Sequence, residues 1–193
     1  MNQRLSVLVT VFAWPMVALA QGNLVFNGGF DSNAAGWLAS NIGIDGGYRS
    51  GKGNPGGYFF LDNAPSASAD PTISQTINGL VTGVTYIVSG DIGFSRTHGG
   101  FFPTEPSFRV TMDGSSSFEY ATQGELEWQH FDFFYMASAS STVLSLSSQI
   151  NNTDISYLVD NIAMQVVPEP SALALCLTGG LIAASRFIRR RKI

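Results

Sequence analysis

The feature that most constrains the fold of this 193-residue chain is a series of short runs rich in aromatic and β-branched residues, separated by Gly, Asn, Asp, Ser and Pro. Phe108, Val110 and Met112 alternate with polar neighbours, as expected where one face of a strand is buried. The runs cover residues 23–26, 57–61, 72–77, 85–94, 107–112, 128–136, 142–148 and 156–166. Because no segment with helical periodicity interrupts them, we expect an all-β fold, an antiparallel β-sandwich of about eight to ten strands.

Glycine-containing stretches mark the connections between these runs. Asp113-Gly114 predicts a hairpin turn. Gly79 and Gly83 predict a tight connection between the third and fourth runs. We expect Trp37, which follows another glycine, to be buried at one end of the sandwich, and the alternative is a role as a platform for a sugar ring.

Residues 1–20 have the organisation of an export signal. Arg4 provides a short positive segment, residues 5–19 are apolar, and Ala18-Leu19-Ala20 is a small-x-small cleavage site. We therefore expect a signal peptide that is cleaved near Gln21. The alternative is that these residues are retained as an N-terminal membrane anchor.

Residues 167–193 combine three blocks with different physical roles. The prolines of Val167-Pro168-Glu169-Pro170 fix φ and remove amide donors, so this segment is expected to stay extended and accessible to a protease. Residues 171–188 predict a transmembrane helix, slightly shorter than the about 20 residues that span a bilayer. The cations that would stop translocation on the cytoplasmic side are Arg186, Arg189, Arg190, Arg191 and Lys192. The alternative, a buried C-terminal helix, lacks amphipathic patterning.

Residues 21–166 remain as one domain of ordinary size. Six of the ten Lys and Arg residues and one of the 14 acids lie outside it, so the domain has four basic and 13 acidic residues and a net charge of −9. This charge excludes a nucleic-acid partner and is compatible with calcium. The single cysteine, Cys176, lies in the apolar tail, so the domain has neither a disulfide nor a thiolate metal site.

The export signal, the Pro-Glu-Pro segment, the apolar run and the Arg-rich end together resemble the bacterial PEP-CTERM sorting system. The three tail blocks stand in the order of that family and at the very C-terminus. The resemblance implies export by a Gram-negative bacterium and anchoring in the inner membrane with the domain in the periplasm. It also implies processing at or near Pro-Glu-Pro by an exosortase, which sends the protein to the cell surface or the extracellular matrix.

Three phrases of the domain look like the galactose-binding-like jelly rolls, which include carbohydrate-binding modules. The domain opens with "NLVFNGGFDSNAAGW", contains "ISQTINGLVTGVTYIVSGDI" and closes with "YLVDNIAMQVV". The resemblance implies that the opening strand lies near the closing strand and that the middle phrase runs between the two sheets.

The same resemblance implies one structural Ca²⁺ between the first and last strands. Asp31, Asp160 and backbone carbonyls would be its ligands, and hard oxygen ligands suit Ca²⁺. Asp31 stands where the family more often has glutamate, and its shorter side chain would weaken the site. In the alternative interpretation, Asp31 caps a turn and Asp160 accepts hydrogen bonds from backbone amides.

The stretch "RTHGGFFPTEP" carries the candidate sugar-binding residues. Phe101 and Phe102 follow two glycines and precede prolines, so we expect them on an exposed loop where they could stack on sugar rings. Arg96 and His98 would donate hydrogen bonds to the sugar. Further candidates are Tyr48, Tyr58 and Tyr120. The alternative is that the two phenylalanines fold back over the core.

Catalytic motifs are scarce in this sequence. Glu125 and Glu127 could form the carboxylate pair of a glycoside hydrolase, but they fit a solvated acidic turn better. No Gly-x-Ser-x-Gly, metal-binding His pair or phosphate-binding loop occurs. We therefore expect a non-catalytic surface or matrix protein that binds carbohydrate, specifically exopolysaccharide. The alternatives are a structural biofilm protein that binds other proteins and, less favoured, a glycan-active enzyme.

Overall fold

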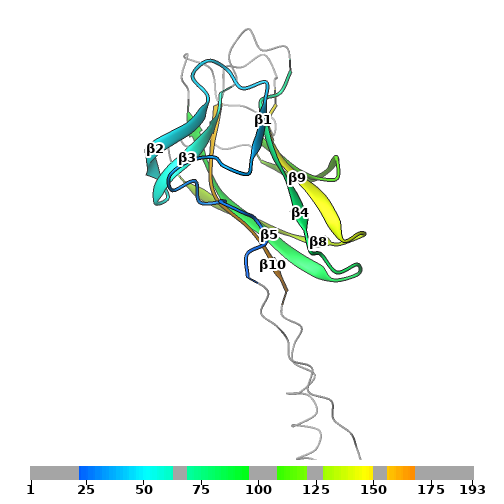
Figure 1. Cartoon of the computed structure of the whole chain (residues 1–193). Helices are drawn as coiled ribbons and strands as arrows, with labels where there is room; N and C mark the ends of the chain where they lie inside the picture. Colours follow the sequence, from blue (N-terminus) through cyan, green and yellow to red (C-terminus); the bar gives the residue numbers. More distant parts are fainter. Residues whose placement is uncertain (1–21, 63–68, 96–107, 121–127, 150–155, 168–193) are drawn as a thin grey trace, which may run out of the picture. The chain divides into compact units, whose positions relative to one another are not determined.

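The domain is a sandwich of two antiparallel sheets with five strands each (Figure 1). The computed structural model describes residues 22–62, 69–95, 108–120, 128–149 and 156–167, and these residues contain no helix. All of them belong to one compact unit, Gln21–Glu169. The all-β, antiparallel sandwich expected from the sequence is confirmed.

The order of the strands within each sheet differs from their order along the chain. The first sheet has the order β1-β4-β9-β6-β7, and the second sheet has the order β2-β3-β10-β5-β8. The strands of the first sheet are β1 (Leu38–Ser40), β4 (Thr72–Asn78), β9 (Ser141–Ser148), β6 (Phe108–Met112) and β7 (Ser115–Tyr120). Those of the second sheet are β2 (Gly47–Gly53), β3 (Gly56–Leu61), β10 (Ser156–Val166), β5 (Thr85–Ser95) and β8 (Gln129–Met136).

Seven of the expected runs are strands, and the differences lie at the sheet edges and at the start of the domain. β1, β2 and β7 were not expected, because they are short, rich in glycine or rich in serine. The run 23–26 is not a strand, so that prediction was wrong. The Leu24 amide of this run donates a hydrogen bond to the Met164 carbonyl of β10 at 2.9 Å. The pairing does not continue, because Asn27 has a φ of 51° and turns the chain away from β10.

Large side chains from both sheets fill the space between them. Phe108 of β6 packs against Tyr157 of β10 and Phe131 of β8, with ring centroids 5.3 and 6.0 Å apart. Tyr86 and Val88 of β5 are fully buried, as are Phe108 and Val110. The period-two alternation of apolar residues therefore identified the inner faces of these strands.

The connection between β4 and β5 carries the chain from one sheet to the other. The two strands do not pair, so the residues between Gly79 and Gly83 form a corner of the sandwich. The Val81 amide donates to the Tyr86 hydroxyl at 2.9 Å, and Leu80 is buried beneath the corner. This placement agrees with the connection between sheets that the middle phrase implied.

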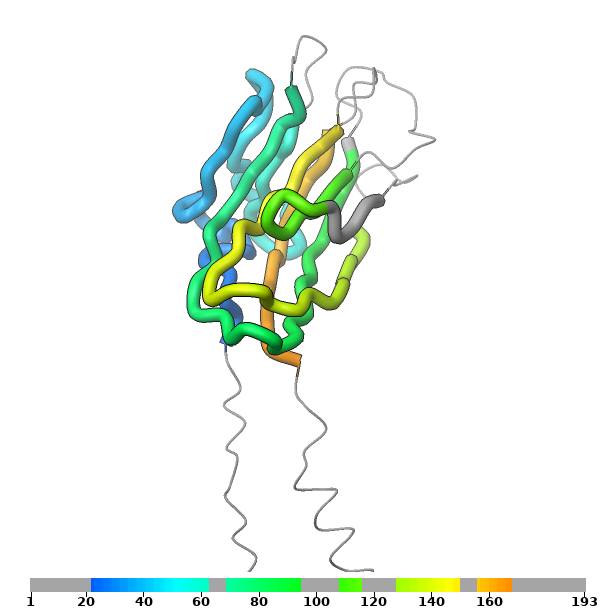
Figure 2. Tube along the Cα trace, turned by 90° about the vertical axis from the view of Figure 1, so that its right-hand side faces the viewer, coloured from blue at the N-terminus to red at the C-terminus, as the bar shows by residue number. Residues whose placement is uncertain are grey.

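The opening segment lies along β10, as the resemblance implied. The Ile162 amide donates to the Gly28 carbonyl at 2.9 Å. A Cβ on Gly28 would lie 1.9 Å from the Ile162 oxygen, so only glycine permits this approach. As a result, the start of the domain and the end of β10 lie at the same end of the sandwich (Figure 2).

Gln75 of β4 attaches the opening segment to the first sheet. Its side-chain amide accepts from the Phe26 nitrogen at 2.8 Å and donates to the Phe26 oxygen at 2.9 Å. Trp37 then packs on the buried Phe30, with ring centroids 5.5 Å apart, and its indole donates to the Asn27 carbonyl. Trp37 thus covers one part of the core but is only partly buried, so the expected burial is partial.

Asp113 and Gly114 form the predicted turn between β6 and β7. Both have positive φ, 51° and 77°. The Asp113 carboxylate accepts from the Val143 amide of β9 at 3.0 Å and from the Tyr135 hydroxyl of β8 at 3.3 Å. The hydrogen bond from the Val143 backbone lowers the pKa of Asp113. The turn therefore links both sheets through one side chain.

Replacing Asp113 should show how much its turn conformation and its hydrogen bonds together stabilise the fold. Asp113→Ala is expected to lower the free energy of unfolding by about 2 kcal/mol, because it combines a positive φ with the loss of the bonds from Val143 and Tyr135. Asp113→Asn keeps a tolerant backbone and an acceptor oxygen and should lose less than about 1 kcal/mol. Chemical denaturation of both variants measures the difference, and equal losses would contradict the combined stabilising role of the turn conformation and these hydrogen bonds.

Candidate functional site

The outward face of the second sheet carries a row of polar side chains across its central strands. In the strand register, Asp160 of β10 lies opposite Asp91 of β5, and Asp91 lies opposite His130 of β8. Register partners point to the same face of a sheet. The row is therefore a product of topology, since its members are far apart in the sequence.

Asp160 is fully buried although it faces outward. The β2–β3 hairpin covers it: the Asn54 amide donates to its Oδ2 at 2.5 Å, and the Asn161 amide donates to its Oδ1 at 2.7 Å. A Cβ on Gly53 would lie 2.9 Å from Oδ2, so glycine lets the hairpin come this close. These bonds match the alternative interpretation of Asp160 as an acceptor of backbone amides, and they leave calcium binding open.

The Asp91 carboxylate makes polar contacts with side chains from three neighbouring segments. Its Oδ2 accepts from the side-chain amides of Asn54 at 3.1 Å and Asn161 at 2.8 Å. Its Oδ1 lies 2.8 Å from Nδ1 of His130. The side chain of His130 is 62% exposed, whereas that of Asp91 is 11% exposed, so the row opens to solvent at its β8 end.

Burial raises the pKa of Asp160 to about 6, above its ordinary value of 3.8. The amides of Asn54 and Asn161 oppose this shift by stabilising the carboxylate, while the charges of Asp91 and Asp31 add to it. Three carboxylates therefore lie close enough to repel one another. A bound cation would relieve that repulsion.

Asp31, the other expected calcium ligand, lies beside the same hairpin. A Cβ on Gly56 would be 2.8 Å from its Oδ1. A Cβ on Gly29 would be 3.6 Å from its Oδ2 and 3.8 Å from Oδ1 of Asn161. The fold thus brings Asp31 near Asp160 and adds amide oxygens, a donor set of the kind that Ca²⁺ accepts. Within the described part of the chain, no group of three or more His, Cys, Asp or Glu residues is arranged to hold a metal ion.

An aromatic pair lies on the same outward face. The rings of Tyr58 from β3 and Trp128 from the start of β8 meet edge to face, with centroids 6.1 Å apart. Trp128 lies over β5 at Gly93, where a Cβ would be 3.6 Å from the indole, an ordinary van der Waals distance. Leu158, which faces the same side from β10, is buried. Both rings of the pair remain partly exposed and border the polar row.

Most of the sites predicted from the sequence lie outside the described residues. Those sites are the sugar-binding candidates Arg96, His98, Phe101 and Phe102, the carboxylates Glu125 and Glu127, the sorting residues Pro168, Glu169 and Pro170, and the terminal cations. Val167 is described, and its amide donates to the Thr85 carbonyl at 3.1 Å. No helix long and apolar enough to cross a bilayer is found among the described residues, and the predicted span 171–188 is not among them.

Sequence reasoning missed Asn54, Asp91, His130 and Trp128, and it ranked Tyr58 low. The alternation of Phe131, Phe133 and Tyr135 could have placed His130 on the outward face, because residues between inward positions point outward. No sequence signal gave the register that puts His130 beside Asp91. Tyr48, another candidate, packs against the core, and its hydroxyl lies 3.5 Å from the Asp31 carbonyl.

Comparison with solved structures finds the same sandwich fold in carbohydrate-binding modules. The second family 16 carbohydrate-binding module is 17% identical, with a TM-score of 0.53, over 74% of this chain and 99% of that one. A family 4 module is 20% identical, with a TM-score of 0.51, over 74% and 99%. No protein-family model matches the sequence, and a search of the curated proteins found no match.

A further structural neighbour belongs to an enzyme. The enzymatically active domain of tailspike protein 4 from Bacteriophage CBA120 is 13% identical, with a TM-score of 0.55, over 75% of this chain. This chain spans 21% of the length of that protein. At these identities the likenesses establish the fold, and binding and activity have to be argued from the site.

The raised pKa of Asp160 predicts a pH dependence of stability in the metal-free protein. The folded state holds an extra proton between about pH 4 and 6, so the free energy of unfolding should fall as the pH rises through that window. For one proton the slope is at most about 1.4 kcal/mol per pH unit. Denaturation in EDTA at several pH values measures it.

Asp160→Asn is the control for this prediction. The variant keeps the side-chain shape but cannot titrate, so its stability should fall less steeply with rising pH. Parallel curves for the two proteins between pH 4 and 6 would show that Asp160 does not titrate in this window.

Proposed function

We propose that this is an exported, non-catalytic protein of the cell surface or extracellular matrix, which binds polysaccharide on the outward face of the second sheet. The observation that supports it is the partly exposed pair Tyr58 and Trp128 beside Asp91 and His130. Sugar rings have apolar C–H faces that stack on aromatic rings and hydroxyl edges that bond to carboxylates and imidazoles. The likeness to carbohydrate-binding modules supports the same ligand class.

Localisation follows from the two ends of the sequence. We propose that residues 1–20 direct export and that residues 171–188 hold the protein in the inner membrane of a Gram-negative bacterium. An exosortase would then process the segment from Val167 to Pro170 and send the domain to the surface. The extended, donor-poor Pro-Glu-Pro segment and the cations from Arg186 onward support this proposal.

One structural Ca²⁺ is proposed beside the β2–β3 hairpin. Asp31 and Asp160 would hold it, together with amide or backbone oxygens of the hairpin region. Burial is the main cause of the raised pKa of Asp160, and the charges of Asp91 and Asp31 add to it, so a cation here would offset their repulsion of Asp160. When bound, the ion would fix the hairpin that covers the polar row.

The binding face is tested by retention of the purified chain on a panel of insoluble polysaccharides. Trp128→Ala and Tyr58→Ala should each weaken binding roughly tenfold, because truncating an aromatic anchor typically costs at least 1 kcal/mol. Val143→Ala is the control, since Val143 is 41% exposed on β9 of the other sheet. A folded protein that no polysaccharide retains would contradict the proposal and favour a structural protein that binds other proteins.

Calcium is tested by thermal unfolding with CaCl2 and with EDTA. If the ion binds, calcium at 100 times its Kd should stabilise the protein by about 2.7 kcal/mol and raise Tm by several degrees. Asp160→Asn and Asp31→Asn should each remove most of this increase. MgCl2 is the control ion because it requires a stricter geometry. Equal Tm values in CaCl2 and EDTA would contradict the calcium site.

A further inference from the structure

Strand β8 presents two large apolar side chains to solvent. Its outward positions are His130, Asp132, Phe134 and Met136, and the last two are each 68% exposed. Hydrophobic side chains that are this exposed and adjacent on one strand commonly mark a binding surface.

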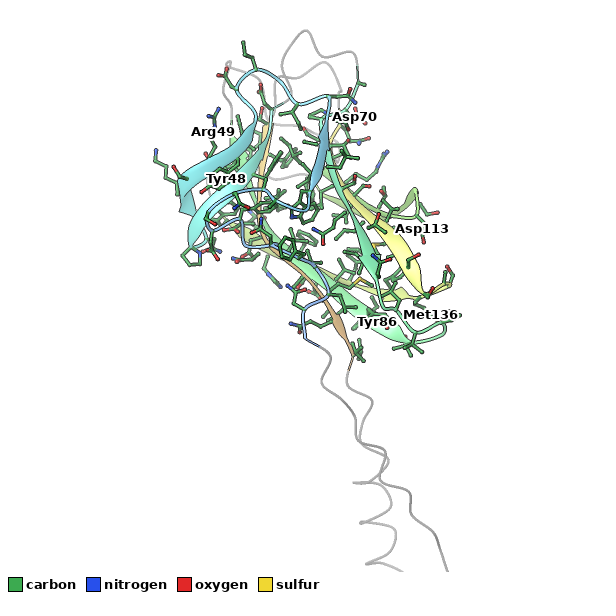
Figure 3. All side chains as sticks on the ribbon, in the orientation of Figure 1. Tyr48, Arg49, Asp70, Tyr86, Asp113 and Met136 are labelled. Atoms are coloured by element: carbon green, nitrogen blue, oxygen red, sulfur yellow. The ribbon has the colours of Figure 1, made fainter. Side chains whose placement is uncertain are left out.

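The exposed side chains continue onto the neighbouring strand. In the register, Phe134 lies opposite Ile87 of β5, which is half-buried. We call Ile87, Phe134 and Met136 the lower strip. Met136 lies at the end of the domain remote from Tyr48 and Arg49 (Figure 3).

The lower strip faces the same side of the sheet as the aromatic pair. Trp128 and Phe134 are six positions apart along β8, which at about 3.3 Å per residue is roughly 20 Å. Between them lie polar outward residues: His130 beside Asp91, and Asp132 opposite Ser89. An aromatic ring, a polar stretch and a second aromatic ring thus follow one another along a single strand.

We propose that the ligand is an extended, uncharged polysaccharide chain that runs along β8 from Trp128 to Phe134, with Phe134 as a second stacking platform. This inference rests on the proposed function and specifies its ligand. A chain of several sugar units is needed to span roughly 20 Å, so a short sugar would reach only one of the two rings.

The charge of the face favours an uncharged chain. Among the described residues, the outward positions of β10, β5 and β8 carry Asp160, Asp91 and Asp132 and no Lys or Arg. Arg49 of the edge strand β2 lies opposite Tyr58 in the register and so faces the same side, away from β8, and its guanidinium donates to the Asp45 carbonyl. Along the path on β8, the carboxylates of Asp91 and Asp132 would therefore repel glycans that carry carboxylates or sulfates.

The test is calorimetric titration of the purified chain with neutral xylo- and cello-oligosaccharides of two to six units, and with oligogalacturonides as the charged probe. Phe134→Ala should lower the affinity for hexasaccharides about tenfold and leave disaccharide affinity unchanged. Trp128→Ala should lower both affinities. Phe134→Tyr keeps the ring and should retain binding, whereas Phe134→Leu keeps only apolar character and should not.

The possible failures of this experiment are distinguishable. If Trp128→Ala weakens binding and Phe134→Ala leaves hexasaccharide affinity unchanged, the second platform is overturned and the proposed function stands. If neither the neutral oligosaccharides nor the polysaccharide panel bind, the proposed function fails as well. Equal affinity for oligogalacturonides would overturn the uncharged ligand. A lower sedimentation mass of Phe134→Ala would assign the lower strip to contact with a second copy of the chain.

Discussion

The structure depends on an irregularity in β10, the central strand of the second sheet. Its register with β5 shifts between Asp160 and Ala163, and Asn161 has a φ of 52°. The bulge lets Asp160 face outward while Ile162 returns to the core two residues later. The Ile162 amide then bonds Gly28, so the same bulge fixes the opening segment.

The fold and the proposed binding face share side chains at this bulge. Asn161 and Asn54 both bond the Asp91 carboxylate, which also contacts the exposed His130. The hairpin that supplies Asn54 also places Tyr58 on the next strand. A change in the charge of Asp160, from protons or from a cation, would therefore alter the contacts of Asp91 and His130 on the proposed binding face, because these groups form one hydrogen-bonded network.

The sequence predicted the sandwich well because burial of one strand face imposes an alternation that can be counted, as for Phe108 and Val110. Edge strands such as β2 were not predicted, because few of their side chains are buried and their sequences show no such alternation. The prediction that Asp31 and Asp160 lie near each other came from a family resemblance. The partners Asp91 and His130 could not be predicted, since their proximity depends on the register of strands nearly 40 residues apart in the chain.

The position of β10 also has a mechanical consequence. It is hydrogen-bonded to β3 on one side and to β5 on the other, and its last residues lead directly to the chain beyond Val167. If that chain were pulled while the sheet face was held in place, the hydrogen bonds of β10 to β3 and to β5 would be loaded in shear. Many of these hydrogen bonds would then have to break together instead of one at a time. If the chain beyond Val167 leads to a membrane anchor and the sheet face binds polysaccharide, as we propose, this arrangement would resist unfolding under such tension.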